Sequence, residues 1–337
     1  MNATMLLEKT KHYPVMLNQV LSIISPQHGG VFVDCTFGGG GYSEAILKHP
    51  DTKVCAIDRD KSVKIYADKL IKKFPKRFNF LINKFSNLNS IFHEDQKTKA
   101  IIFDLGLSSF QLADKERGFS FKSKDSLSME MGINKYSAYD VINILEKKEL
   151  ARIIKALGEE KDGKLIASRI IKYRTKKKIR TSEELSLIIN EVKKNYNKYK
   201  KNPATKTFQA IRIFVNQELT ELFLGLIEAA KCLKEGGILV VISFHSLEDK
   251  IVKFFFNEYS NNKKNPSRYL PPNEKNLSLF ETISKKPLTP DENEIRKNSR
   301  SKSAKLRFAV RNKNSFFEPI EFKKKFESYL NLEEMKL

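Results

Sequence analysis

The sequence is short of cysteine, of long apolar runs, and of acidic residues relative to basic ones. Its three cysteines, Cys35, Cys55 and Cys232, form no C-x-x-C pair, which excludes a disulfide scaffold and a cysteine-ligated zinc site. No run of about 18 uncharged apolar residues occurs, which excludes a membrane-spanning helix. Near the N-terminus the apolar stretch 5–7 is too short for the core of a signal peptide. These absences predict a soluble, cytoplasmic protein without a bound metal.

The shortage of acids produces a large positive charge. The chain has 40 Asp and Glu against 62 Lys and Arg, a net charge of +22 over 337 residues. This surplus predicts a polyanionic partner, nucleic acid first and an anionic membrane surface second. A lysine-rich genome would give the same surplus without a partner. The densest basic segments are 173–180, 193–206, 262–269 and 296–311. Tyr196 and Tyr199 lie among lysines, a mixture that suits stacked bases and phosphates.

Short apolar runs alternate with helical patterns in the first third of the chain. We predict strands at 31–36, 54–58, 78–82 and 100–105. We predict helices between them at 43–48, 61–74 and 87–93. Continuous apolar runs are typical of strands that are buried on both faces of a parallel sheet. The alternation predicts right-handed strand–helix–strand units and a doubly wound sheet.

The pattern changes after residue 111. From 112 to 201 no strand signal recurs, and we predict helices at 138–157, 164–174 and 182–195. The earlier rhythm then resumes, with predicted helices at 207–233 and 247–259 and strands at 238–244, 280–284 and 306–311. We therefore predict an α/β fold in which residues 1–111 and 202–337 form the sheet domain. Residues 112–201 form an inserted helical domain of ordinary domain size.

The segment 34–41, DCTFGGGG, lies between the first predicted strand and a helix. Glycines there let the backbone turn sharply and approach a ligand at the helix N-terminus. The dinucleotide pattern G-x-G-x-x-G fits only in part, because Ser43 holds its last position. The acidic-x-G-x-G-x-G loop of S-adenosylmethionine sites fits better, with Asp34, Gly38 and Gly40 in place and Thr36 at the first glycine. The early acid suits an ammonium group and repels a pyrophosphate, so a nicotinamide-dependent oxidoreductase is the weaker interpretation.

Further polar side chains are predicted at the carboxyl edge of the sheet. Asp58 ends the second strand and is placed to accept hydrogen bonds from both ribose hydroxyls of an adenosine. Asp104 ends the fourth strand and is placed to accept one from an amine being methylated. His245 follows the fifth strand, either to contact base or phosphate or to cap the next helix. Methylation of a cytosine carbon needs a cysteine nucleophile, and we interpret all three cysteines as small core residues. Transfer to nitrogen or oxygen is therefore favoured.

Seven motifs occur in order along nearly the whole chain, and together they resemble the MraW/RsmH family of bacterial methyltransferases. They are HYPVMLNQVL (12–21), DCTFGGGGYSEAIL (34–47), AIDRD (56–60), DLGLSSFQLADKERGFSF (104–121), TFQAIRIFVNQEL (207–219), VISFHSLEDKIVK (241–253) and SAKLRFAVR (303–311). The resemblance implies methylation of the N4 of a cytidine in 16S ribosomal RNA. It also implies a Rossmann-like methyltransferase sheet with an inserted helical domain, which agrees with the organisation above.

The resemblance implies S-adenosyl-L-methionine as the cofactor and the decoding region of the small ribosomal subunit as the partner. By position it implies the cofactor-binding residues Gly40, Gly41, Tyr42, Asp58, Phe85, Asp104 and Gln111. Asp104 is expected to orient the target amine, with Ser108, Ser109 and His245 as further catalytic candidates. Methyl transfer to nitrogen needs no covalent enzyme intermediate, so positioning carries the catalysis.

This chain departs from the family pattern at a few positions. Family members commonly have Arg and His where this chain has Gly39 and Tyr42, and Pro where it has Phe110. The stretch 126–132, SLSMEMG, stands in place of PLDMRMD, with two acids and an arginine lost. These changes leave open an alternative function, that of a non-catalytic ribosome-assembly factor with the same fold. The oligomeric state also stays open, with a dimer among the options, and no membrane association is expected.

Overall fold

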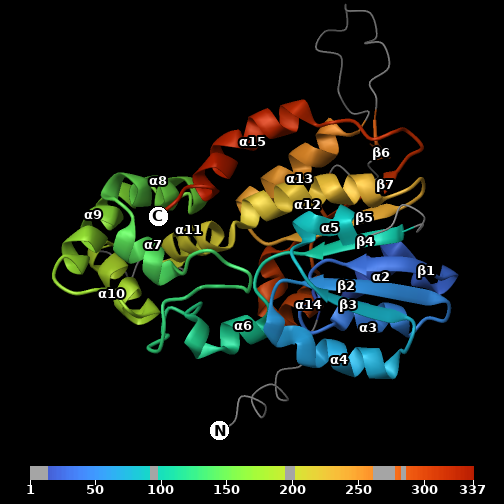
Figure 1. Ribbon diagram of the computed structural model, residues 1–337, viewed down its shortest axis with the longest axis horizontal. Helices are drawn as coiled ribbons and strands as arrows, with labels where there is room; N and C mark the ends of the chain where they lie inside the picture. The colour runs from blue at the N-terminus through green and yellow to red at the C-terminus, as the bar shows by residue number, and fades with distance from the viewer. Residues whose placement is uncertain (1–13, 92–97, 194–201, 261–277, 282–285) are drawn as a thin grey trace, which may run out of the picture. The chain divides into compact units, whose positions relative to one another are not determined.

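A computed structural model of the chain describes residues 14–91, 98–193, 202–260, 278–281 and 286–337. These residues form two compact units. The sheet unit comprises the described residues of His12–Gly106 and Glu221–Phe326, and the helical unit those of Leu107–Thr220 and Glu327–Leu337 (Figure 1). The predicted domain boundaries, with an insert at 112–201, stay a prediction.

The sheet unit contains seven strands in the order β3-β2-β1-β4-β5-β7-β6. They are β1 (Gly30–Asp34), β2 (Thr52–Asp58), β3 (Phe78–Ile82), β4 (Thr98–Asp104), β5 (Ile238–Ser243), β6 (Phe280–Glu281) and β7 (Lys305–Arg311). Strands β1 to β5 are parallel, and β7 is antiparallel to β5 and β6. The predicted doubly wound α/β fold is confirmed. Of the strand predicted at 280–284, residues 282–284 lie outside the described residues.

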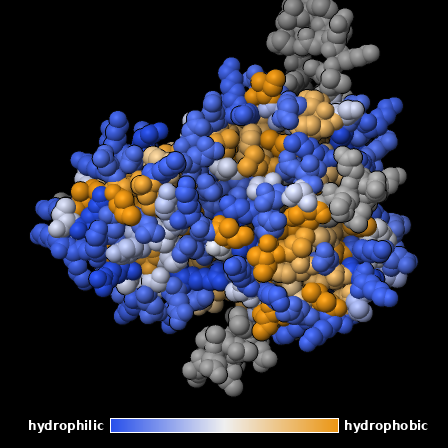
Figure 2. All heavy atoms as spheres, in the orientation of Figure 1, coloured by the Kyte–Doolittle hydropathy of each residue, from blue (hydrophilic) through white to orange (hydrophobic). Residues whose placement is uncertain are grey.

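Helices cover both faces of the sheet (Figure 1). One face carries α2 (Leu17–Ile24), α3 (Gly41–Leu47) and α4 (Lys64–Lys73), and the other α5 (Leu88–Ile91), α12 (Glu218–Cys232) and α13 (Ser246–Glu258). Successive strand residues point to opposite faces. Ala56 and Ile102 are buried among apolar residues of α2, α3 and α4, whereas Phe103 lies close to Gly225 of α12. Burial on both faces explains why the central strands β4 and β5 read as continuous apolar runs. Figure 2 shows that hydrophilic residues cover most of the visible surface, with apolar atoms exposed over part of the sheet.

The helical unit is built from short amphipathic helices. They are α6 (Ser109–Ala113), α7 (Ala138–Ile144), α8 (Lys147–Leu157), α9 (Gly163–Arg174), α10 (Ser182–Val192) and α11 (Thr205–Asn216), with the end of α15 (Ile320–Glu333). In α8 the buried residues recur at steps of three and four: Leu150, Ile153, Ile154 and Leu157. As predicted, the described residues between 112 and 193 contain no strand. Among all described residues, none of the helices is long and apolar enough to cross a membrane.

Three predicted helices are divided in the structure, so their predicted extents were wrong. The helix predicted at 138–157 breaks at Leu145, because Glu146 caps α8 through a reciprocal capping box with Glu149. The helix predicted at 207–233 breaks at Gln217, whose φ of 50° closes α11 in the left-handed conformation. The helix predicted at 61–74 begins as a 3-10 turn before α4. Local caps outweigh an apolar period that continues across the break.

Several predictions fall wholly or partly outside the described residues. The ends of the helices predicted at 87–93 and 182–195 lie there. So do the basic segment 262–269 and most of the basic segment 193–206, including Tyr196 and Tyr199.

Candidate functional site

The candidate site lies where the strand order of the sheet reverses. Strand β1 is followed outward by β2 on one side, and β4 is followed by β5 on the other. Ligands of doubly wound sheets bind at the carboxyl ends of the strands at such a point. Asp34, Asp58 and Asp104 end β1, β2 and β4. Three carboxylates are therefore placed at one edge of the sheet, as predicted.

The loop between β1 and α3 depends on glycines at two close approaches. Gly40 has a φ of 77°, and a Cβ there would lie 2.8 Å from the ring of Phe37. A Cβ on Gly41 would lie 2.5 Å from Cγ of Pro14. The structure thus requires both glycines for packing within the protein, in addition to any ligand they approach.

Asp34 and Asp58 hold this loop in place. Asp34 accepts hydrogen bonds from Ser43 Oγ at 2.7 Å and from the Thr36 N–H at 3.3 Å. Asp58 accepts from the N–H groups of Gly38 and Asp60 at 2.8 and 2.9 Å. Burial raises the pKa of both carboxyls to about 6. Asp58 therefore supports the loop, and its contact with a ribose stays a prediction.

Thr36 connects β1 to β4. Its Oγ1 accepts a hydrogen bond from the Asp104 N–H at 2.7 Å. Nearby, the Cys35 N–H donates to the Ile102 carbonyl at 2.9 Å. Sequence reasoning treated Thr36 only as an exception to the glycine pattern. The structure shows a side chain that fixes the end of β4 and with it the position of Asp104.

Asp104 has one carboxylate oxygen occupied and one vacant. Tyr42 is buried, and its hydroxyl makes hydrogen bonds with the Val15 carbonyl and the Asp104 carboxylate. Oδ1 of Asp104 is shielded from solvent and has no hydrogen-bond partner among the described residues. Burial raises the pKa of Asp104 well above its usual range, and the nearby charge of Asp34 raises it further. The arrangement leaves one acceptor atom for a ligand at this edge of the sheet.

The segment before α2 closes over the glycine loop. Pro14 packs against Gly41, and the Val15 carbonyl accepts from Tyr42. The Met16 N–H donates to Oε1 of Glu294 at 2.6 Å, across 278 sequence positions. Glu294 belongs to α14 (Glu292–Lys297). No sequence signal singles it out, because its partner is a backbone group at the other end of the chain.

Phe85 is held by the sheet and by α12. Its ring packs edge-on against Phe103, with centroids 5.1 Å apart and an interplanar angle of 90°. A Cβ on Gly225 would lie 2.5 Å from the Phe85 ring. The ring position is therefore set within the sheet unit. Its predicted packing on adenine stays a prediction.

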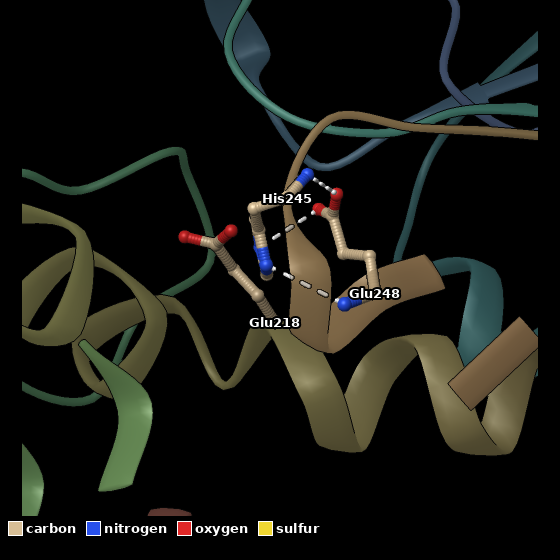
Figure 3. Close-up of side chains that lie close together, drawn as sticks. All are labelled: Glu218, His245 and Glu248. Atoms are coloured by element: carbon tan, nitrogen blue, oxygen red, sulfur yellow. Dashed lines mark hydrogen bonds and ion pairs between the residues drawn. The ribbon is translucent and has the colours of Figure 1, made fainter. Parts of the chain in front are cut away.

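His245 caps α13 (Figure 3). Its Nδ1 accepts from the Glu248 N–H at 3.4 Å, and its Nε2 lies 3.2 Å from Oε1 of Glu248. Oε2 of Glu248 accepts from the N–H groups of Phe244 and His245 at 2.8 and 3.2 Å. The structure thus shows the capping alternative for His245, and its contact with base or phosphate stays a prediction. Sequence reasoning missed Glu248, although an acid three residues after a cap residue is a readable signal.

Glu218, also labelled in Figure 3, accepts hydrogen bonds from the Arg212 guanidinium within the helical unit.

Ser108, Ser109 and Gln111 belong to the helical unit, where they begin α6. Ser108 Oγ accepts from the Gln111 N–H at 3.2 Å, and Gln111 Oε1 accepts from the Ser108 N–H at 3.0 Å. These contacts form a capping box, so the catalytic and cofactor roles of the three residues stay predictions. Phe110 occupies the first turn of α6, where a proline is also tolerated because the N–H groups there have no partner within the helix.

The departing stretch 126–132 keeps its buried positions. Leu127, Met129 and Met131 are buried, and they are the positions at which this chain and the family pattern agree. Asn216 clamps the backbone: its Oδ1 accepts from the Met131 N–H and its Nδ2 donates to the Met129 carbonyl, both at 2.8 Å. The substitutions stand at the alternate, less buried positions 126, 128, 130 and 132. The substitutions therefore change the less buried side chains of the stretch. They do not change its buried side chains or the backbone groups that bind Asn216.

Residues 9–312 match the MraW methylase family. The chain belongs to this family. It is similar to the Ribosomal RNA small subunit methyltransferase H of Ehrlichia canis (strain Jake), with 44% identity over 302 residues, 88% of this chain and 98% of that protein. The protein of the same name from Ehrlichia ruminantium (strain Welgevonden) is 44% identical over 301 residues, with the same coverage. A solved rRNA methylase from Streptococcus thermophilus has a TM-score of 0.35 at 9% identity over 90% of this chain and 99% of that one, too distant to add to the argument. The family resemblance of the seven motifs is confirmed, and the chain is a methyltransferase.

Proposed function

We propose that this chain transfers the methyl group of S-adenosyl-L-methionine to the exocyclic N4 of a cytidine in 16S ribosomal RNA. The cytidine belongs to the decoding region of the small subunit. The observation that carries the proposal is the vacant, shielded Oδ1 of Asp104 at the centre of a methyltransferase sheet. The names of the similar proteins support a small-subunit RNA substrate, and the net charge of +22 supports a polyanion.

The residues of the sheet edge fit S-adenosyl-L-methionine. Asp34 is buried, and Asp58 and Asp104 are partly buried. Burial raises the pKa of all three carboxyls, and shielding their negative charge is costly unless a cation compensates it. The cofactor carries two cationic groups, an ammonium and a sulfonium. An ionised carboxylate has about four acceptor positions, so Asp58 keeps capacity for ribose hydroxyls beside its two backbone donors. When bound, the cofactor supplies an electrophilic methyl group.

Asp104 orients the target nitrogen. Its Oδ1 accepts a hydrogen bond from the N4 amino group, which holds the nitrogen in line for attack; such positioning contributes roughly 7–11 kcal/mol to lowering a barrier. The raised pKa suits the same carboxylate to accept the proton that the nitrogen loses. Thr36 and Tyr42 keep Asp104 in position through its backbone N–H and its side chain.

The state of the cysteines favours nitrogen over carbon as the methyl acceptor. Burial raises the pKa of Cys35 well above its usual range and raises those of Cys55 and Cys232 to about 11. At neutral pH these groups are thiols, whereas attack on a cytosine carbon requires a thiolate.

Nucleoside mass spectrometry of 16S RNA from a deletion strain tests the proposal. We expect loss of N4-methylcytidine, restored by the natural chain and not by Asp104→Ala. An unchanged N4-methylcytidine content in the deletion strain would contradict the substrate. Calorimetry with S-adenosyl-L-methionine and with NAD tests the cofactor, and we expect binding of the former alone. Protein that binds small subunits without consuming cofactor would instead favour the assembly factor.

A further inference from the structure

The helical unit contains a cleft of about 540 Å³ that is separate from the residues of the sheet edge. Its walls are the second half of α8, the connection from α8 to α9, and the end of α15. We call it the basic cleft and define it by Arg152, Lys155, Glu159, Glu160, Lys161, Tyr329 and Leu332. Pockets of about 300–1,000 Å³ hold small organic ligands, so one nucleotide fits this volume.

The basic cleft carries a surplus of unpaired positive charge. Arg152, Lys155 and Lys161 are exposed and have no carboxylate partner among the described residues. Of the two acids in the lining, Glu160 is paired with Lys193, whose Nζ lies 2.8 Å from Oε1 and which also pairs with Asp162 outside the lining. The lining thus has three basic side chains against two acidic ones, and the lysine that pairs with Glu160 is not one of the three. Arginine and lysine bind phosphate through charge-assisted hydrogen bonds, so the surplus favours an anionic ligand.

The walls of the cleft are fixed by hydrogen bonds and close packing. A Cβ on Gly158 would lie 2.3 Å from the Lys206 carbonyl, and Lys206 Nζ donates to the Glu159 carbonyl at 2.9 Å. At the other wall, Glu333 accepts from the N–H groups of Leu219 and Thr220 at 3.1 and 2.7 Å. A preformed site spares the ligand the cost of ordering it.

The wall that α15 supplies is aromatic and apolar. Tyr329 is half-buried, and Leu332 is buried with 4% of its surface exposed. Stacking of a base on an aromatic side chain contributes about 1–3 kcal/mol and tolerates any base. An anion site beside such a wall matches a nucleotide better than a bare phosphate.

We propose that the basic cleft binds one unpaired nucleotide of the RNA substrate. Arg152, Lys155 and Lys161 hold its phosphate, and its base lies against Tyr329. The basic cleft thereby binds the RNA through residues that take no part in methyl transfer. This inference rests on the proposed RNA substrate, and its tests read binding separately from methylation.

A single-tryptophan reporter tests occupancy directly. The chain has no tryptophan, so Tyr329→Trp gives one emitter, whose fluorescence is quenched when a base stacks on it. We expect saturable quenching by a single-stranded oligoribonucleotide, at least about ten-fold weaker quenching by cytidine 5′-monophosphate, and none by inorganic phosphate. The same reporter with Arg152→Gln and Lys155→Gln should lose affinity about ten-fold or more. Absence of quenching by the oligonucleotide would overturn the proposal. Equal affinity for the mononucleotide would overturn it in favour of a free nucleotide ligand.

A charge-matched pair of double variants tests the role in catalysis. Arg152→Gln/Lys155→Gln should raise the KM for small subunits about ten-fold, leave kcat unchanged, and lower the slope of log affinity against log salt by about two. Lys147→Gln/Lys148→Gln removes two charges from the same helix outside the cleft and should have a clearly smaller effect. If the two double variants changed KM and the salt slope equally, RNA binding would depend only on the overall positive charge of α8. That result would overturn the proposal that the basic cleft binds a nucleotide. Quenching of the Tyr329→Trp reporter by the oligonucleotide, together with wild-type protein that does not methylate small subunits, would overturn the proposed function and leave the cleft intact.

Discussion

The sheet edge and the basic cleft use charge in opposite ways. At the edge, hydrogen bonds from neighbouring groups hold the carboxylates of Asp34, Asp58 and Asp104, and they thereby set the position even of the vacant Oδ1 of Asp104. In the cleft, Arg152 and Lys155 are exposed and have no acidic partner within the described residues. Positioning a reacting atom requires preorganised groups, whereas capture of a polyanion requires only charge within reach. The edge should therefore be sensitive to shape and the cleft to charge.

The largest effect is expected from Asp104→Ala. Loss of the only vacant carboxylate oxygen recorded at the described edge should lower the rate of methylation about 100-fold or more. Asp104→Asn keeps the shape and should be nearly as slow, since an amide does not accept the proton. Methyl incorporation into small subunits measures the rate, and thermal unfolding checks the fold. A rate within about three-fold of wild type would remove Asp104 from the mechanism.

Gly41→Ala should weaken cofactor binding about 10–100-fold, because overpacking by one methyl costs about 1–3 kcal/mol. The added Cβ would lie 2.5 Å from Pro14 and would displace the loop. Gly236→Ala is the control: Gly236 has a φ of 79° with nothing within 4 Å of a Cβ, so the variant is strained but leaves the loop untouched. Calorimetry should show weak cofactor binding in the first variant alone. Equal affinities would show that the edge tolerates changes of shape.

Stability should fall as pH rises through the range in which Asp34 and Asp58 ionise. Their pKa values rise from 3.8 to about 6 through burial. Between about pH 4 and 6 the folded protein thus binds more protons at these sites than the unfolded chain does, so this contribution to the free energy of unfolding decreases with pH. Relative to Asp58→Asn, the wild type should lose about 1–3 kcal/mol between pH 4 and 7 in urea unfolding.

Asp249 provides a control of opposite sign. Burial opposes its ionisation, but hydrogen bonds and charges of Arg307 and Lys305 outweigh burial and lower its pKa. Relative to Asp249→Asn, the wild type should therefore gain stability as pH rises through about 4. If the free energies of unfolding of Asp58→Asn and Asp249→Asn, each relative to wild type, changed with pH in the same direction, the predicted opposite pKa shifts of the two carboxyls would be contradicted.

Thr36→Val should have a moderate effect. The variant keeps the shape but leaves the Asp104 N–H without its acceptor, which costs about 1–2 kcal/mol. We expect methylation to slow roughly five-fold, since Asp104 moves with its backbone. Thr52→Val removes comparable hydrogen bonds, to the carbonyls of Ile46 and His49. It should destabilise the fold similarly without slowing methylation, and equal rates in the two variants would count against the role of Thr36.

The smallest effect is expected in the cleft. Lys155→Arg changes the shape of the side chain and keeps its charge, so affinity for RNA should stay within about two-fold of wild type. Lys155→Gln should weaken binding several-fold and reduce the salt slope by about one. Filter binding at several salt concentrations measures both. A large loss in Lys155→Arg would show that the cleft, like the edge, depends on geometry.

The central strands β4 and β5 were predictable because they are buried on both faces and therefore read as unbroken apolar runs. The edge strand β3 carries a similar apolar run although only Phe78 of it is buried. The prediction at 78–82 matches β3, and that at 54–58 ends, like β2, at Asp58. Helix boundaries were less predictable: Gln217 adopts a left-handed conformation that its residue type does not announce. The periodic apolar pattern simply continues past it.

Within the candidate site, the acidic residues were predictable because they end strands, and that position alone brings them to one edge. Their supports were not. Thr36 acts on a backbone group 68 positions away, and Tyr42 acts partly on the carbonyl of Val15. These contacts involve backbone N–H and carbonyl groups, which nearly every residue has, so no residue type in the sequence marks them. They can be identified only once the fold is known.

The bond between Met16 and Glu294 bears on how the protein is made. The segment that packs on the glycine loop lies near the start of the chain, whereas the carboxylate that fastens it belongs to α14. Domains form as the nascent chain leaves the ribosome, N-terminal parts first. Here the loop is synthesised early but is fastened only after residue 294 has emerged. A partly synthesised chain therefore lacks the hydrogen bond that fastens the segment over the glycine loop. We expect the cofactor site to be complete only near the end of translation.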